Sequence, residues 1–138
     1  MEILDRLKSM VGVGAPTIAL AELPGPVRSG ALLRSTVILH GGDYDTPIKD
    51  VQVRLDEERL VYPTPGRPDR QFWRRLAEVV INLDGRVLHK HERLELSFEL
   101  VVPADLPPSD TAIGYELFAE TEVPGLNPKT ELVVIVEA

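Results

Sequence analysis

The spacing of apolar residues divides the chain into a short helical opening and a long series of strands. Over residues 1–12 apolar side chains recur at helical spacing with charged residues between them, at Ile3, Leu7, Met10 and Val11. The pattern predicts one amphipathic helix, too short to be stable unless its apolar face packs against something. We expect that face to dock on the end of the same domain, and a contact with a partner or a second copy in a homodimer is the alternative.

From residue 17 onward apolar and polar residues alternate, which is the period of a strand with one buried face. In segment 48–57, for example, Val51, Val53 and Leu55 are apolar and the residues between them are polar. Similar strands are predicted at 17–23, 30–40, 72–83, 86–88, 93–102, 112–120 and 131–136. Turn residues separate them, including the hairpin-type pair Asp84-Gly85. The pattern predicts a single all-β domain over residues 1–138, an antiparallel β-sandwich.

Composition and charge narrow the classes of function. The 138 residues are 43% hydrophobic and 27% charged, as in an ordinary globular domain. The net charge of -7 argues against nucleic acid as a partner, because a phosphate-binding surface needs an excess of Lys and Arg. The lack of cysteine excludes disulfides, Cys-ligated zinc and iron–sulfur clusters. With no apolar stretch typical of a signal peptide or a membrane span, we expect a cytoplasmic protein without integral membrane association.

No motif in the chain indicates catalysis or a cofactor. The serines lie in no nucleophile-elbow pattern, and no Gly-rich phosphate loop precedes a helix. His89 and His91 would share one face of a strand, and His40 would complete a set of three imidazoles. Lys90 and the charged residues around it favour a solvated link instead. We therefore expect no enzyme activity, no cofactor and no metal site.

Three aspartates crowd the loop that precedes the 48–57 strand. Asp43, Asp45 and Asp50 resemble the acidic loops of sandwich domains that bind calcium. Calcium takes about six to eight oxygen ligands from several loops, and only this loop supplies them. Aspartate in a Gly-rich loop also serves ordinary turn chemistry. A calcium- or ligand-dependent binding module using the Asp43–Asp50 loop is therefore the alternative function.

The most unusual local composition is an aromatic and basic segment in the middle of the chain. It contains Arg70, Phe72, Trp73, Arg74 and Arg75. Trp and Arg often anchor protein interfaces, and a basic surface on an acidic molecule would orient an acidic partner. A solvated loop whose aromatics cap the sandwich is the other interpretation. If the segment binds a partner, charge reversal of both Arg74 and Arg75 abolishes the capture of that partner without unfolding the protein.

Three segments, taken in order, resemble the bacterial sporulation-control protein family, whose fold is arrestin-like. The first is the helical opening with residues 11–18. The second is 33–42, an apolar strand ending in Gly-Gly, followed by the strand 48–55. The third is the alternating, Phe-containing strand 96–100, which leads through the prolines of 102–109 to the Tyr-bearing strand at 113–117. The resemblance covers nearly the whole chain.

The resemblance implies an immunoglobulin-like, arrestin-like β-sandwich with one short N-terminal helix. It also implies a non-catalytic regulatory or scaffold protein that acts on other proteins in the cytoplasm. Longer members of the family continue past the point where this chain ends, so functions seated in their second half are not carried over. Nothing matches the phosphate-sensing charged core of the receptor-binding arrestins, so phosphoprotein recognition is not implied either.

Overall fold

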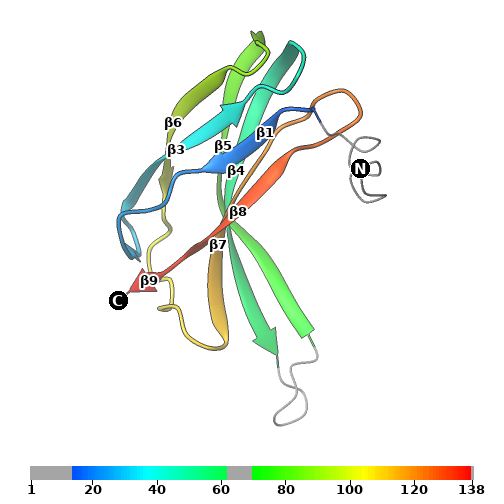
Figure 1. Cartoon of the computed structure of the whole chain (residues 1–138). Helices are drawn as coiled ribbons and strands as arrows, with labels where there is room; N and C mark the ends of the chain where they lie inside the picture. Colours follow the sequence, from blue (N-terminus) through cyan, green and yellow to red (C-terminus); the bar gives the residue numbers. More distant parts are fainter. Residues whose placement is uncertain (1–13, 62–69, 138) are drawn as a thin grey trace.

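The computed structural model describes residues 14–61 and 70–137, and within these ranges the chain forms strands and connecting segments only (Figure 1). This confirms the all-β class. The helix predicted over residues 1–12, with Ile3, Leu7, Met10 and Val11, lies outside the described residues. The strands are β1 (Thr17–Leu20), β2 (Val27–Arg28), β3 (Leu32–His40), β4 (Thr46–Val61), β5 (Arg70–Leu88), β6 (Arg93–Val101), β7 (Ile113–Glu120), β8 (Lys129–Val134) and β9 (Val136–Glu137).

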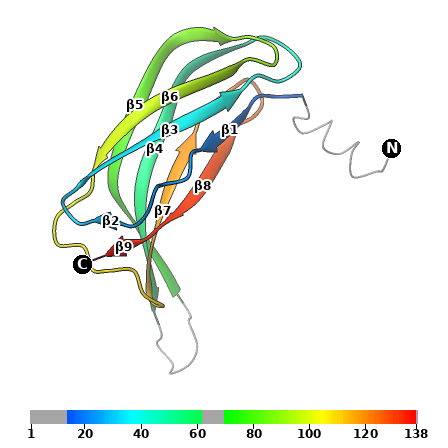
Figure 2. The same cartoon turned by 60° about the vertical axis from the view of Figure 1, so that its left-hand side comes forward.

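The strands pair into two larger sheets and one small one. The order is β1-β3-β6 in a three-stranded sheet and β5-β4-β7-β8 in a four-stranded sheet, and every pairing in both is antiparallel. Strands β2 and β9 form a parallel pair, which the sequence did not predict. Figure 2 shows β1, β3 and β6 lying across one face of the four-stranded sheet. The opposite face of that sheet is called the outer face below.

The core lies between the two larger sheets. Val51, Val53 and Leu55 of β4 are fully buried, while Gln52 between them is exposed, as the alternation predicts. They belong to one cluster with residues of the facing sheet such as Val37. Burial of one such side chain stabilises the fold by about 1.5–3 kcal/mol. Among the described residues, no helix is long and apolar enough to cross a membrane.

Strand β5 differs from the prediction at two places. Asp84 and Gly85 do not form a hairpin turn but lie inside one continuous strand, with φ values of 53° and 77°. Their positive φ produces an irregularity against β4, where the register shifts between Ile48 and Asp50. The predicted turn is therefore wrong. Residues that favour the left-handed region are suited to a bulge as well as to a turn, and here they form an irregularity within the strand. A second register shift, at Leu55/Asp56, leaves one residue of β5 without a partner on β4.

The hairpin of β4 and β5 is the longest feature of the fold. The two strands have 16 and 19 residues, and β4 pairs with β5 on one edge and with β7 on the other. Figure 1 shows the lower ends of β4 and β5 extending beyond the three-stranded sheet. This arrangement places the aromatic and basic segment of β5 at the protruding end.

Candidate functional site

The structure separates the residues of the predicted aromatic and basic segment. Trp73, Arg74 and Arg75 pair with Glu58, Glu57 and Asp56 of β4, respectively. Successive residues of a strand point to opposite faces, so Trp73 and Arg75 lie on the outer face and Arg74 lies on the other. Arg70 and Phe72 also belong to β5, but their side chains lie outside the described part of the structure.

Arg74 is a counter-ion of a buried carboxylate. The Glu57 side chain is only 4% exposed, and it accepts hydrogen bonds from Arg59 Nε at 2.8 Å and from Arg74 Nη2 at 3.3 Å. The hydrogen bond with Glu57 raises the pKa of Arg59. The pKa of the neighbouring Tyr115 is raised, mainly because the side chain is buried and to a smaller extent because Glu57 is negatively charged. We therefore expect charge reversal of Arg74 to lower the stability of the fold, and the expectation that Arg74 and Arg75 can be reversed together without unfolding stays a prediction.

An aromatic and cationic cluster crosses the outer face from the edge strand β5 to the inner strands β4 and β7. The guanidinium of Arg54 lies 4.8 Å from the centroid of the Phe118 ring. The same group donates hydrogen bonds to Asp56 Oδ2 at 3.2 Å and to Glu120 Oε1 at 3.3 Å. Trp73 meets Phe118 edge to face, with ring centroids 6.2 Å apart and an interplanar angle of 74°. Trp73 nevertheless stays 48% exposed, so the cluster is open to a partner.

Asp56 lies beneath this aromatic contact. On β4, Trp73 is opposite Glu58 and Phe118 is opposite Arg54. The contact between the two aromatic rings therefore crosses β4 at Asp56, which lies between Arg54 and Glu58 on the same face. Asp56 is 9% exposed, and its Oδ1 atom is buried without a hydrogen-bond partner in the described part of the chain. A buried carboxylate oxygen in that state is rare in proteins, because its desolvation is not compensated.

Acidic side chains outnumber basic ones on the outer face. The acidic residues are Asp56, Glu58, Glu78, Glu116, Glu120 and Glu131, and the basic ones are Arg54, Arg75 and Lys129. Arg75 is paired with Glu78 at 2.7 Å. Burial raises the pKa of Glu116, and the charges of Glu131, Glu58 and Asp56 raise it further. The outer face is therefore negative, in contrast to the basic surface that the sequence suggested.

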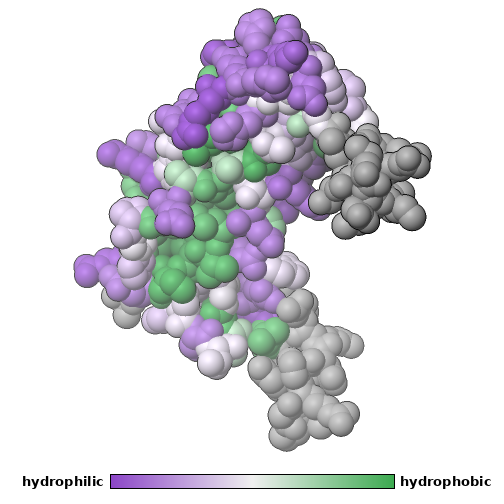
Figure 3. Space-filling model, in the orientation of Figure 1, coloured by the Kyte–Doolittle hydropathy of each residue, from purple (hydrophilic) through white to green (hydrophobic). Residues whose placement is uncertain are grey.

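Apolar residues and two hollows surround the charged cluster. Val80 and Val133 are 49% and 67% exposed on β5 and β8. A hollow of about 350 Å³ is lined by Arg54, Phe118, Glu120, Lys129, Thr130 and Glu131. Val133 also lines a second hollow of about 310 Å³, together with Leu23, Pro26 and Ile135. Figure 3 shows hydrophobic residues gathered near this second hollow, where the segment after β1 runs beside β8 and β9.

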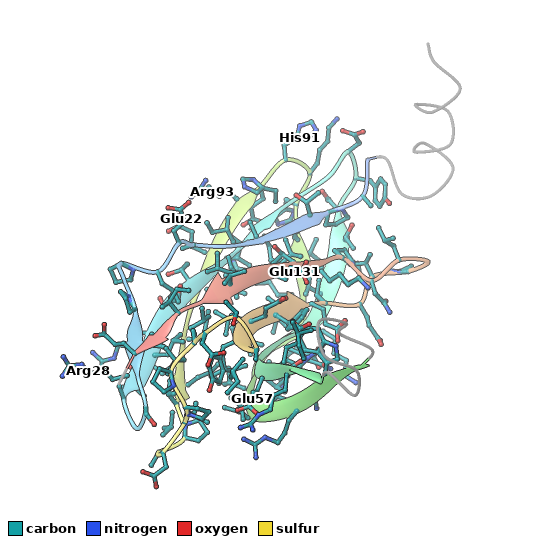
Figure 4. The ribbon with its side chains drawn as sticks, turned by 90° about the horizontal axis from the view of Figure 1, so that it is seen from below. Glu22, Arg28, Glu57, His91, Arg93 and Glu131 are labelled. Carbon is teal, nitrogen blue, oxygen red and sulfur yellow. The ribbon has the colours of Figure 1, made fainter. Side chains whose placement is uncertain are left out.

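The Asp43–Asp50 loop uses its carboxylates internally. Asp43 Oδ1 lies 3.1 Å from His91 Nε2, and Asp45 accepts the Lys90 backbone N–H at 2.8 Å. The hydrogen bond from the Lys90 backbone N–H is the main cause of the lowered pKa of Asp45. Within residues 14–61 and 70–137, no group of three or more His, Cys, Asp or Glu could hold a metal ion. Figure 4 shows His91 apart from Glu131 of the outer face, so this loop and the outer face are separate parts of the surface.

The sequence alone did not single out Arg54, Asp56, Glu57 or Phe118. Glu57 breaks the apolar run of inward positions on β4, and that break is a readable signal of a buried charge. Phe118 and Asp56 gave no signal, because their importance depends on which strands become neighbours. Only the pairing of β4 with both β5 and β7 brings Trp73, Asp56 and Phe118 together.

Comparisons with known proteins match this chain to a family model and to solved structures. A family model named Spo0M, described as SpoOM protein, matches residues 4–125. The crystal structure of Spo0M, a sporulation control protein from Bacillus subtilis, matches with a TM-score of 0.79 at 14% sequence identity. The match covers 91% of this chain and 51% of that chain, so this chain spans about half the length of its relative. No curated protein matches in sequence. The resemblance read from the sequence is confirmed.

Proposed function

This chain belongs to the Spo0M family of sporulation-control proteins, and we propose from that premise that it is a non-catalytic regulator acting through protein–protein interaction. Its two stacked antiparallel sheets support an arrestin-like, immunoglobulin-like sandwich as the scaffold for this role. The cytoplasm is the proposed compartment. The partner is another protein, and the binding surface is the outer face of the four-stranded sheet.

The observation that carries this proposal is the exposure of Trp73 within an ordered cluster. A tryptophan that is 48% exposed, packed against Phe118 and next to Arg54, has the composition of an interface anchor. Arg54 and Phe118 lie on β4 and β7, which are each paired on both sides, and Trp73 lies on the edge strand β5, where it packs against Phe118. Little conformational freedom of Arg54 and Phe118 is therefore lost when a partner binds. The exposed valines Val80 and Val133 add apolar area elsewhere on the same face.

Site-specific photo-crosslinking in the native cell tests the proposal. A photoreactive phenylalanine analogue replaces Val80 on the outer face, and the matched control replaces Val101 of β6, another exposed strand valine. We expect a discrete crosslinked protein from position 80 that disappears when Trp73→Ala is added. The mass of the product distinguishes a different protein from a second copy of this chain.

Absence of a product at position 80, or the same products at positions 80 and 101, would contradict the proposal. Retention of the position-80 product in the Trp73→Ala variant would show that the cluster is not the anchor. Each variant is compared with the unmodified protein by circular dichroism and thermal unfolding, so that loss of crosslinking is not confused with loss of the fold.

A further inference from the structure

We infer that the outer face receives a cationic side chain, a lysine ammonium or an arginine guanidinium of a protein partner, above Asp56 and beside Glu116. This inference rests on the proposed function, because it names the chemistry of the partner at the same surface. It stands on three features of the site: an open hydrogen-bond acceptor, an excess of negative charge, and aromatic and apolar walls.

The open acceptor is the Oδ1 atom of Asp56. Arg54 satisfies only the other oxygen, Oδ2, at 3.2 Å. Oδ1 is buried and has no partner among the described residues, although Asp56 itself is 9% exposed. A buried acceptor of this kind gains most from a charged donor, since hydrogen bonds from ammonium or guanidinium groups to carboxylates are the strong ones. An incoming cation supplies that missing donor.

The outer face carries more carboxylates than cations, and one of the three cations that the structure describes there, Lys129, lies opposite Glu120 on β7 and not beside Asp56. Arg54 is shared between Asp56 and Glu120, and Arg75 is engaged by Glu78. Glu58, Glu116 and Glu131 form no ion pair within the parts of the chain that the structure describes. The raised pKa of Glu116, caused by burial and by its acidic neighbours, reports the same crowding. A positive charge placed between these carboxylates would relieve their repulsion.

The walls of the site suit the long stem of a basic side chain. The Trp73–Phe118 contact spans the position of Asp56, and the half-exposed ring of Trp73 can contact a cation, whereas the Phe118 ring already has the Arg54 guanidinium over it. Val133, directly opposite Glu116 on β8, is 67% exposed and can pack against a methylene stem. Trp73 is 48% exposed, so this aromatic wall is itself accessible to a partner from solvent.

This assignment reverses the charge expected of the partner from sequence alone. The arginines of the aromatic and basic segment suggested an acidic partner. In the structure Arg74 is bound by Glu57 and Arg75 by Glu78, so neither offers its full charge to a partner. Within the described part of the chain, carboxylates are the charged groups that remain without a counter-ion around Trp73. Charge complementarity therefore favours a basic segment of the partner protein.

The test uses the purified chain and defined cationic probes. Trp73 is the single tryptophan of the sequence, so its fluorescence reports binding at the site. The probes are oligolysine and oligoarginine peptides, with acetylated oligolysine as the uncharged counterpart. We expect a saturable change with the first two and none with the third. No saturable change with either cationic peptide would overturn the inference.

Two matched double variants separate the site from the bulk charge of the protein. Glu116→Gln/Glu131→Gln removes two carboxylates of the site, whereas Glu95→Gln/Glu99→Gln removes two exposed carboxylates of β6. We expect the first to weaken binding about tenfold or more and the second about twofold or less. Equal weakening in both would show non-specific attraction to an acidic protein and would refute the site.

Asp56→Asn provides an independent check that keeps the size of the side chain. We expect it to weaken the binding of both cationic peptides while the far-UV circular dichroism stays unchanged. Unaltered affinity would remove Asp56 from the site. The inference and the proposed function can fail separately: crosslinking at position 80 with no response to the cationic peptides retains the function and rejects the cationic chemistry.

Discussion

Arg74 and Arg75 are neighbours in sequence but lie on opposite faces of β5, and reversing the charge of each should have very different effects. Arg74 donates to Glu57, a carboxylate that is 4% exposed, at 3.3 Å. Arg75 pairs with Glu78 at 2.7 Å, and both side chains of that pair are more than one third exposed. The first pair protects a buried charge, and the second is a surface ion pair.

The expected magnitudes follow from this difference in burial. Arg74→Glu removes one charge-assisted hydrogen bond from Glu57, which costs about 1–2 kcal/mol because Arg59 still holds the carboxylate. The new glutamate adds repulsion of about 1 kcal/mol in a solvated setting. The total of about 2–3 kcal/mol corresponds to a fall in Tm of about 10 °C for a domain of this size. Arg75→Glu should change the free energy of unfolding by about 0.5 kcal/mol or less.

Urea denaturation of the two variants beside the wild type measures both effects. A third comparison places Arg74→Glu in a Glu57→Gln background, where the loss of stability should shrink to about 1 kcal/mol or less because the buried charge is gone. Equal destabilisation by Arg74→Glu and Arg75→Glu would refute the assignment of these residues to opposite faces. An Arg74→Glu penalty that persists in full without the Glu57 charge would refute the ion-pair explanation.

Three further changes test other parts of the structure. Gly42→Ala should cost about 2 kcal/mol or more in urea denaturation, because its Cβ would overlap the carbonyl of Gly14, whereas Gly114→Ala, with open space around it, should be neutral or stabilise by about 0.5 kcal/mol. Since burial and neighbouring carboxylates raise the pKa of Glu116 above 4.5, the folded state holds that proton more tightly, and stability falls as pH rises through this range. Glu116→Gln should remove this fall and gain about 0.5 kcal/mol near neutral pH, and an unchanged pH profile would contradict it. Tyr115→Phe should lose about 1 kcal/mol in the same assay with its bond to the Pro107 carbonyl, and a neutral result would show that the bond contributes nothing.

Periodicity predicted most of the strands but not the course of β5. Alternation is a local property, so the apolar residues of β4 and β6 were identified as inward-facing from the sequence alone. Asp84-Gly85 was read as a turn because a left-handed pair fits a hairpin and a bulge equally well. The choice between them depends on whether β4 continues alongside, which is a non-local fact. The parallel pairing of β2 with β9 was missed for the same reason.

The candidate site was predicted in part. Trp73 and Arg75 were identified by their composition, and the structure places them on one exposed face. Arg74 was grouped with them on composition, although the alternation of the predicted strand 72–83 already places it on the opposite face from Trp73 and Arg75. Asp56 and Phe118 acquire their roles through the pairing of β4 with β7, which brings together residues about sixty positions apart in the chain.

The long β4–β5 hairpin also has a consequence for the order in which the chain folds. Its strands are close in sequence, so closing them requires little loss of chain entropy, whereas β3 must wait for β6 from the other side of the hairpin. The hairpin should form early, and the three-stranded sheet should then close over its apolar face. In pulsed hydrogen exchange during refolding, amides of Gln52 to Leu55 would then gain protection before those of Thr36 to Leu39. A mutation that weakens the hairpin would slow folding, while one in β1 would mainly hasten unfolding.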